Sequence, residues 1–315
     1  MRTATSLNRV DPQAADAAQG PSLVLAPKPE ATPSGVSPAA QQAETPIRRV
    51  AAWLRSALPK LLMTMLSLGL FVAFWYFATK YKLDLYIRFT NIPSPGEVWD
   101  NAARLAQSDK FYNNMYVSLR RILLGFSIAT VLGVALGLLI GQYRGARALL
   151  FPLFETLRPV PAIAWVPMAI MLWPTNETSI VFITFLGSFF PILLNTIHGV
   201  NSVDPVLLRA ARCLGTSEYG LLRQVVLPAS LPHIFTGLAI GMGVAWVSLI
   251  AAEMISGQFG IGYFTWEAYA LIEYADIAIG MIVIGVLGLL CSGAIRMLGN
   301  MLMPWMAGPT HGGQK

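Results

Sequence analysis

Two charged side chains lie in an apolar stretch of this sequence that is interrupted by prolines. Glu155 and Arg158 are three residues apart, and Pro159 follows directly. A charge in such surroundings is costly and commonly marks a functional site, and an arginine there could attract an anion. The same spacing also fits an Arg158–Glu155 pair on one helix, or an arginine that extends to the surface of an apolar layer, so these readings stay open.

Other side chains in the apolar stretches are further candidates for the same site. Residues of these types also pack or line interfaces, and that alternative stays open for each of them. The complete candidate path consists of Arg158, Pro159, Trp165, Ser188, Asn195, Trp246 and Glu253.

The sequence lacks the motifs of the common catalytic and cofactor sites. No lysine follows a glycine, so a phosphate-binding GxxxxGK[ST] loop is absent, and GxSxG is absent as well. Gly260-Ile261-Gly262 lacks the third glycine of a dinucleotide site. Three histidines and two cysteines lie outside metal-ligand spacings: His198, His233, His311, Cys213 and Cys291. We therefore expect no catalytic residue, no metal site and no cofactor in this chain.

Composition places the chain in a membrane. Only 12% of the 315 residues are charged and 55% are hydrophobic, whereas a soluble domain carries about 25% charged residues. These values exclude a disordered chain and argue against an ordinary soluble enzyme. The net charge of +6 is better explained by basic residues that flank membrane spans than by nucleic-acid binding.

Apolar runs close to the roughly 20 residues that cross a bilayer predict six membrane helices. They lie at about 60–79, 119–141, 148–173, 178–200, 234–255 and 277–302. The third run contains Pro152, Pro159, Pro161 and Pro167, and each removes a backbone donor. It is either a kinked packing helix or one wall of a path across the membrane.

Regions outside these runs define the organisation. Residues 1–46 are rich in Ala, Pro, Gln, Ser and Thr and predict a disordered cytoplasmic tail. The membrane domain then covers 47–310, and 311–315 form a short tail. Basic residues near the span ends place both termini in the cytoplasm, although the basic loop 80–118 breaks this pattern.

That loop contains a predicted short helix, and two spans carry a spacing of small residues. Ser94, Pro95 and Glu97 form a capping signal for a helix that lies along the outer membrane surface or simply connects two spans. Glycine or alanine recurs every four residues at Gly133, Gly137 and Gly141, and at Gly237, Gly241 and Ala245. Such spacing predicts close packing within the chain, with self-association as the alternative.

The segment 201–233 is too polar to span a membrane and has its own helical pattern. Asp204 can cap a helix that begins at Pro205. An apolar face is predicted at Leu207, Ala210, Ala211 and Leu214. Gly215 fits a helix end, and a second helix from about 217 to 226 would stop at Leu227-Pro228. A hairpin lying on lipid headgroups is the competing interpretation.

This segment resembles the EAA loop of binding-protein-dependent ABC importer permeases. The matching positions are Ala210, Ala211, Gly215, Val225, Leu227 and Pro228, while Arg209 stands where the family usually has an acidic residue. Six further segments resemble the nitrate/sulfonate/taurine branch: IPSPGEVW, SLRRILLGF, LRPVPAIAWVP, FFPILLNTIHGV, AWVSLIAAEM and GIGYFTWEAY. The resemblance covers about residues 80–310.

The resemblance implies an all-α membrane protein with six transmembrane helices and the type I (MetI-like) permease fold. It implies two permease copies, usually identical, with partner ATPase subunits that bind ATP and Mg, and a substrate-binding protein outside a bacterial inner membrane. The implied coupling residues are Asp204, Arg209, Ala210, Ala211, Gly215, Glu218, Leu227 and Pro228.

The expected cargo is a small anion of the nitrate, sulfonate or taurine type. Bicarbonate, cyanate or a cation resembling a thiamine precursor also remains open, because specificity resides largely in the binding protein. The competing function is an ion-coupled secondary transporter, which would show inverted repeats and buried acids that this sequence does not offer. A membrane-embedded enzyme is the other alternative, and no catalytic constellation supports it.

Overall fold

The computed structural model describes residues 46–82 and 91–306, and within these ranges it contains helices and no strand. The predicted N-terminal tail, up to residue 45, and the tail 311–315 lie outside the described residues. Residue contacts divide the chain into a small unit, Met1–Met63, and a large unit, Thr64–Lys315. Helix α1 (Pro46–Lys80) runs through the boundary. Apart from the first residues of the span in α1, the features discussed below belong to the large unit.

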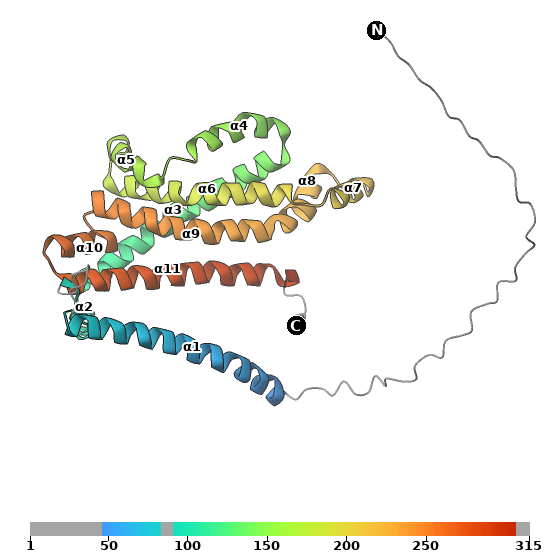
Figure 1. Cartoon of the computed structure of the whole chain (residues 1–315). Helices are drawn as coiled ribbons and strands as arrows, with labels where there is room; N and C mark the ends of the chain where they lie inside the picture. The colour runs from blue at the N-terminus through green and yellow to red at the C-terminus, as the bar shows by residue number, and fades with distance from the viewer. Residues whose placement is uncertain (1–45, 83–90, 307–315) are drawn as a thin grey trace, which may run out of the picture. The chain divides into compact units, whose positions relative to one another are not determined.

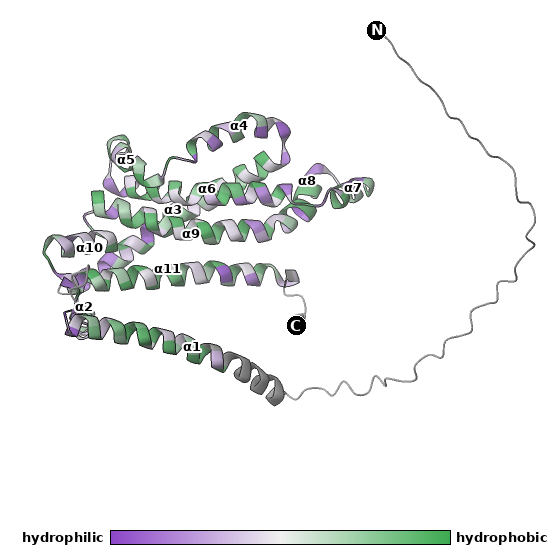
Figure 2. Ribbon diagram, in the orientation of Figure 1, coloured by the Kyte–Doolittle hydropathy of each residue, from purple (hydrophilic) through white to green (hydrophobic). Residues whose placement is uncertain are grey.

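The predicted membrane helices are confirmed. Five helical stretches are long and apolar enough to cross a membrane, or six if one bent pair counts as a span. The five are Leu61–Lys80 of α1, α3 (Asp109–Gln142), α6 (Asn176–Asn201), the run Glu218–Ser256 that contains α9, and α11 (Tyr274–Leu302). Green, hydrophobic residues dominate these helices in Figure 2.

The third predicted span is broken rather than merely kinked. Helix α4 (Arg144–Leu157) ends before Pro159, and a 3-10 turn, η3 (Ala162–Trp165), leads into α5 (Val166–Leu172). The two parts are bent by 85°. Pro159 and Pro161 supply no backbone donor, so the helical hydrogen bonds cannot continue through this stretch.

The fifth span begins earlier than the sequence predicted. The short helix α8 (Glu218–Leu221) does not stop at Leu227-Pro228 but passes through a π-helical turn, η4 (Leu222–Val226), into α9 (Leu227–Ser256). The Leu227 amide donates to the carbonyl of Leu222, five residues back. This wider turn admits Pro228 without ending the helix, and the predicted helix end there is therefore wrong.

Helix α6 packs against both α3 and α9, and the three helices together build the central hydrophobic core of the large unit. The spaced glycines lie in both interfaces, the one between α3 and α6 and the one between α6 and α9. A Cβ atom on Gly137 of α3 would lie 2.5 Å from Cβ of Thr196, and one on Gly237 of α9 would lie 2.7 Å from Cβ of Asn195. The helix backbones are thus as close as glycine allows, which confirms the predicted packing within the chain.

The two ends of this bundle carry different short helices (Figure 1). Helix α7 (Pro205–Cys213) and α8 lie at one end. Helix α10 (Ile261–Ala270) and α2 (Pro95–Leu105) lie at the other, where the predicted capping box of Ser94 and Glu97 is present. Helix α2 packs through Val98 onto the cluster of α10 and α11, so it is anchored to the bundle.

We predict that Gly137→Ala destabilises the protein. The added methyl overlaps Thr196 in the tightly packed interface of α3 and α6, and overpacking of this kind costs about 1–3 kcal/mol. The measurement is thermal unfolding of the purified protein in detergent. Gly285→Ala on α11 is the matched control, because a Cβ there meets no atom within 4 Å. Equal unfolding temperatures for the two variants would refute the close-packing account.

Candidate functional site

The segment between α6 and α9 has the predicted bent, capped geometry. The Asp204 carboxylate accepts a hydrogen bond from the Val206 amide at 2.8 Å, and Pro205 is the first residue of α7. Gly215 follows α7 with φ of +79°, a left-handed conformation that glycine adopts without strain. Arg212 of α7 and Glu218 of α8 form an ion pair of 3.2 Å across this bend. These contacts define a helical hairpin, residues 204–221, which we call the coupling hairpin after the role that the sequence resemblance implies.

The coupling hairpin exposes an apolar face. The side chains of Leu207 and Leu214 are 54% and 86% exposed, and Ala210, one turn from each, is exposed as well. Ala211, which was predicted on the same face, is half-buried against a small cluster that includes Val203. Arg209 is exposed beside this face. An exposed row of large apolar side chains of this kind is typical of a contact surface.

The remaining predicted hairpin residues lie at its junction with α9. Leu227 is partly buried against the central core, and Pro228 is the second residue of α9. Together with η4 they join the coupling hairpin to α9 in one helical run from Glu218 to Ser256. The junction therefore contains no loop.

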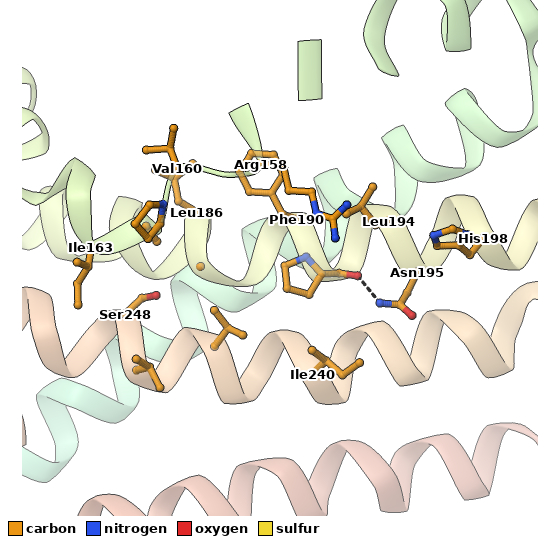
Figure 3. A pocket seen from close by; sticks show the side chains of 16 residues that line it. Arg158, Val160, Ile163, Leu186, Phe190, Leu194, Asn195, His198, Ile240 and Ser248 are labelled. Carbon is orange, nitrogen blue, oxygen red and sulfur yellow. Dashed lines mark hydrogen bonds between the residues drawn. The ribbon is translucent and has the colours of Figure 1, made fainter. Parts of the chain in front are cut away.

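A groove of about 700 Å³ runs between the broken segment after α4 and the faces of α6 and α9 (Figure 3). Its polar lining comes from Arg158, Asn195, His198 and Ser248. Apolar side chains such as Ile240 complete the wall. Prolines that break the third span make this arrangement possible, because the non-helical backbone there faces a cavity.

Arg158 combines two of the roles that the sequence left open. Its guanidinium lies 3.4 Å from the Glu155 carboxylate, and both side chains are about half exposed at 55% and 49%. It also lines the groove. An exposed pair holds its members weakly, so this arginine is available to another anion.

Asn195 and Arg158 are the predicted path residues that line this groove, and the others do not. Ser188 is fully buried and donates to the Thr184 carbonyl at 2.9 Å. Trp165 and Trp246 pack in the central core, and Pro159 lies between groove residues without lining the cavity. Sequence reasoning missed His198 and Ser248. The apolar residues around them gave no signal, because only the break in the third span brings these side chains to one surface.

Glu253 does not line the groove and lies in a buried polar cluster. Its side chain is 0% exposed and forms an ion pair of 2.9 Å with Arg121 of α3, whose side chain is 2% exposed. Arg121 also pairs with Glu177 at the start of α6. The sequence reading overlooked Arg121, although an arginine pair at 120–121 next to an apolar run was a usable signal.

Metal binding finds no support in this geometry. Among residues 46–82 and 91–306, no group of three or more His, Cys, Asp or Glu side chains is arranged to hold a metal ion. The two carboxylates near Arg121 are both engaged by its guanidinium.

We predict that cysteines placed in the groove react with a water-soluble thiol reagent and those behind it do not. Asn195→Cys lines the cavity, whereas Ser188→Cys, two turns earlier on α6, is enclosed by protein. The measurement is the rate of modification by a charged methanethiosulfonate in detergent, in a background without the two native cysteines. A modification rate at Asn195→Cys that is as low as the rate at Ser188→Cys would show that the groove is not accessible to water.

Comparison with known proteins finds a matching family model and several relatives of this chain. The family model described as binding-protein-dependent transport system inner membrane component matches residues 129–308. The chain is 36% identical over 224 residues to the nitrate import permease protein NrtB of Synechocystis, covering 68% of this chain and 82% of that protein. It is 44% identical over 174 residues to the bicarbonate transport system permease protein CmpB of Synechococcus elongatus, covering 55% and 63%.

Solved structures share the fold at low sequence identity. An amino acid ABC transporter structure aligns with a TM-score of 0.53 at 16% identity, over 64% of this chain and 96% of that one. A bacterial ABC transporter for import of alginate aligns with a TM-score of 0.56 at 13% identity, over 81% and 97%. The fold, the family match and the identities agree: this chain belongs to the family of binding-protein-dependent transport system inner membrane components, the permease subunits of ABC importers.

Proposed function

We propose that partner ATPase subunits bind the coupling hairpin and drive import through this permease. The single observation that carries the proposal is the exposed apolar face of Leu207, Ala210 and Leu214 on a capped, bent pair of helices. The exposed arginines that flank this face, Arg209 and Arg212, would attract acidic residues on the surface of a protein partner. ATP and Mg are bound by the partners, since this sequence has no phosphate-binding loop.

The path of transmission is the helical run Glu218–Ser256. Because α8, η4 and α9 form one helix, a displacement of the coupling hairpin moves α9 along its whole length. The Arg212–Glu218 pair ties α7 to the start of this run. Closure of the ATPase dimer on ATP binding then shifts the equilibrium between inward-facing and outward-facing states, because it binds one state better than the other.

The groove forms one wall of the substrate path, and a second copy of the chain supplies the opposite wall. Residues of α6 and α9 line the groove, and its apolar side chains Ile240 and Val247 are 49% and 66% exposed. A homodimer would enclose Arg158 from each copy around one path. Both termini and the coupling hairpin lie on the cytoplasmic side of a bacterial inner membrane, and a substrate-binding protein delivers the cargo from the side of α10.

The cargo is a small anion. Two named relatives are permeases for nitrate and bicarbonate, which are both small oxyanions. Arg158, with Asn195 and Ser248 as hydrogen-bonding groups nearby in the groove, offers the positive charge and donors that an oxyanion requires. Sulfonates and taurine carry the same kind of oxyanion and belong to the proposed class.

We predict that Ala210→Trp uncouples ATP hydrolysis from uptake. The indole would hold the ATPase surface away from the exposed face, and uptake should fall about tenfold, equivalent to about 1.4 kcal/mol. Ala210 is the better test position than Ala211, whose half-buried side chain also supports the hairpin. The measurement is substrate uptake and ATP hydrolysis by the reconstituted complex.

Ala148→Trp on α4, another exposed alanine, serves as the control for a bulky substitution. Full uptake by the Ala210→Trp complex would exclude the coupling hairpin as the ATPase contact.

We predict that Arg158→Gln weakens transport of the anion and that Arg158→Lys restores most of it. A charge interaction in a partly dehydrated groove contributes about 1–4 kcal/mol, so the KM for uptake should rise roughly tenfold or more. Arg144→Gln, an exposed arginine of α4 that does not line the groove, is the matched control. An unchanged KM for Arg158→Gln would place anion recognition elsewhere.

A further inference from the structure

We infer that Ser118, Arg121 and Glu253 are positioning residues that fasten α10 to the ends of α3 and α9, so that α10 moves as one body with the helix that starts at the coupling hairpin. We call these three residues and Asn114 the α10 clamp. The clamp itself is a feature of the geometry. Its part in transport rests on the proposed function, in which the coupling hairpin is moved by ATPase subunits.

Glu253 is the centre of the clamp. Its carboxylate accepts hydrogen bonds from the Arg121 guanidinium at 2.9 Å, from the Ser118 hydroxyl at 2.8 and 2.9 Å, and from the Gly262 amide at 2.9 Å. These donors come from α3 and α10, while Glu253 itself lies three residues before the end of α9. One buried carboxylate thus holds three helices together.

The chain that leads into α10 is held at successive residues. The Gly260 amide donates to the Asn114 side chain at 3.0 Å, and the Ile261 amide donates to the Ser118 hydroxyl at 2.8 Å. Arg121 donates to the Phe259 carbonyl at 2.6 Å. Four consecutive residues, 259–262, are therefore each bound to the clamp, and the start of α10 has no freedom to rotate against α3.

The backbone at this point accepts no side chain. Gly260 has φ of +120°, and a Cβ placed on it would overlap the carboxylate of Glu253. Gly262 is similarly close to the Cβ of Glu253, at 2.8 Å. The close approach of the backbone to the buried carboxylate thus explains why Gly260 and Gly262, which do not form a dinucleotide motif, are both glycines.

The polar composition of the clamp suits a role in orienting α10 better than a role in stabilising the fold. Burying a charge pair costs about as much as the attraction returns, and well-packed apolar residues often stabilise a core as well or better. Directional hydrogen bonds from a guanidinium and a carboxylate instead select one geometry. A polar cluster that specifies the position of α10 is consistent with an element that must transmit movement.

The geometry also joins the two ends of the molecule. The coupling hairpin begins the helical run at Glu218, and Glu253 lies close to its other end at Ser256. The outward surface of α10 carries exposed aromatic side chains, Trp266 and Tyr269. A displacement that starts at the hairpin therefore reaches this aromatic surface through one continuous helix and one rigid clamp.

A second tie between α3 and α10 provides a matched control. Lys110 and Glu267 form an ion pair of 3.0 Å, with side chains that are 62% and 31% exposed. Exposed pairs of this kind contribute little to fixing two elements. Loss of this pair should leave α10 in place, whereas loss of a clamp residue should not.

The experiment measures the rigidity of α10 and the efficiency of transport in the same variants. The permease is assembled with its ATPase subunits and binding protein in lipid nanodiscs or proteoliposomes, with Cys213 and Cys291 replaced by serine. Spin labels are attached at Thr236→Cys on α9 and Tyr269→Cys on α10, both exposed in the structure. Labelled copies are diluted with unlabelled ones so that one copy reports its own internal distance.

In the unmodified protein and in Lys110→Gln, we expect one narrow distance that is the same without nucleotide and with trapped ATP. In Ser118→Ala and Glu253→Gln, we expect a broad distance distribution. We also expect the ratio of substrate taken up to ATP hydrolysed to fall by about fivefold or more, the lower end of typical coupling between distant sites.

A narrow distance in both clamp variants, or an unchanged uptake-to-hydrolysis ratio in both, would overturn the inference. Glu253→Gln leaves Arg121 without its buried partner, so this variant could fail to assemble. Ser118→Ala removes no charge, and in that case its distance distribution and its uptake-to-hydrolysis ratio alone test the inference. Failure of the proposed function is seen separately, as absence of ATP-driven uptake in the unmodified complex.

Discussion

The close approach of α6 to α3 and α9 is the constraint on which the rest of the structure depends. A membrane interior offers helices no hydrophobic reason to associate, so van der Waals contact between backbones must hold them. Glycines such as Gly137 and Gly237 allow that contact. Once α6 is fixed on both sides, one face of α6 and one of α9 remain free beside the broken third span, and these faces form the groove.

In the proposed function, the same packing determines how movement at one end of the molecule reaches the other. Helix α9 packs against α6 along its length, so in this proposal it moves as a rigid body that connects the coupling hairpin to the α10 clamp. At the hairpin end a π-helical turn replaces the expected helix break, and at the other end Glu253 binds Arg121. The first junction is continuous helix, and in the short connection at the second junction Phe259 and Gly260 are hydrogen-bonded to Arg121 and Asn114.

The sequence predicted much of the fold and part of the site, for reasons that individual residues explain. Local signals were reliable: Asp204 caps α7, Gly215 ends it, and the apolar runs form the spans. The sequence could not show that Leu227-Pro228 continues a helix, because the π-turn depends on hydrogen bonds five residues apart. Nor could it pair Glu253 with Arg121, since only tertiary packing brings residues 132 positions apart together.

The account depends most directly on where the coupling hairpin lies and what covers it, and the native Cys213 at the end of α7 is an exposed reporter for both. The decisive measurement is the labelling rate of Cys213 by a membrane-impermeant maleimide, in a Cys291→Ser background. The account predicts labelling only from the cytoplasmic side, and strong protection when the ATPase subunits are bound. Labelling from outside intact cells, or an equal rate with and without the ATPase subunits, would contradict it.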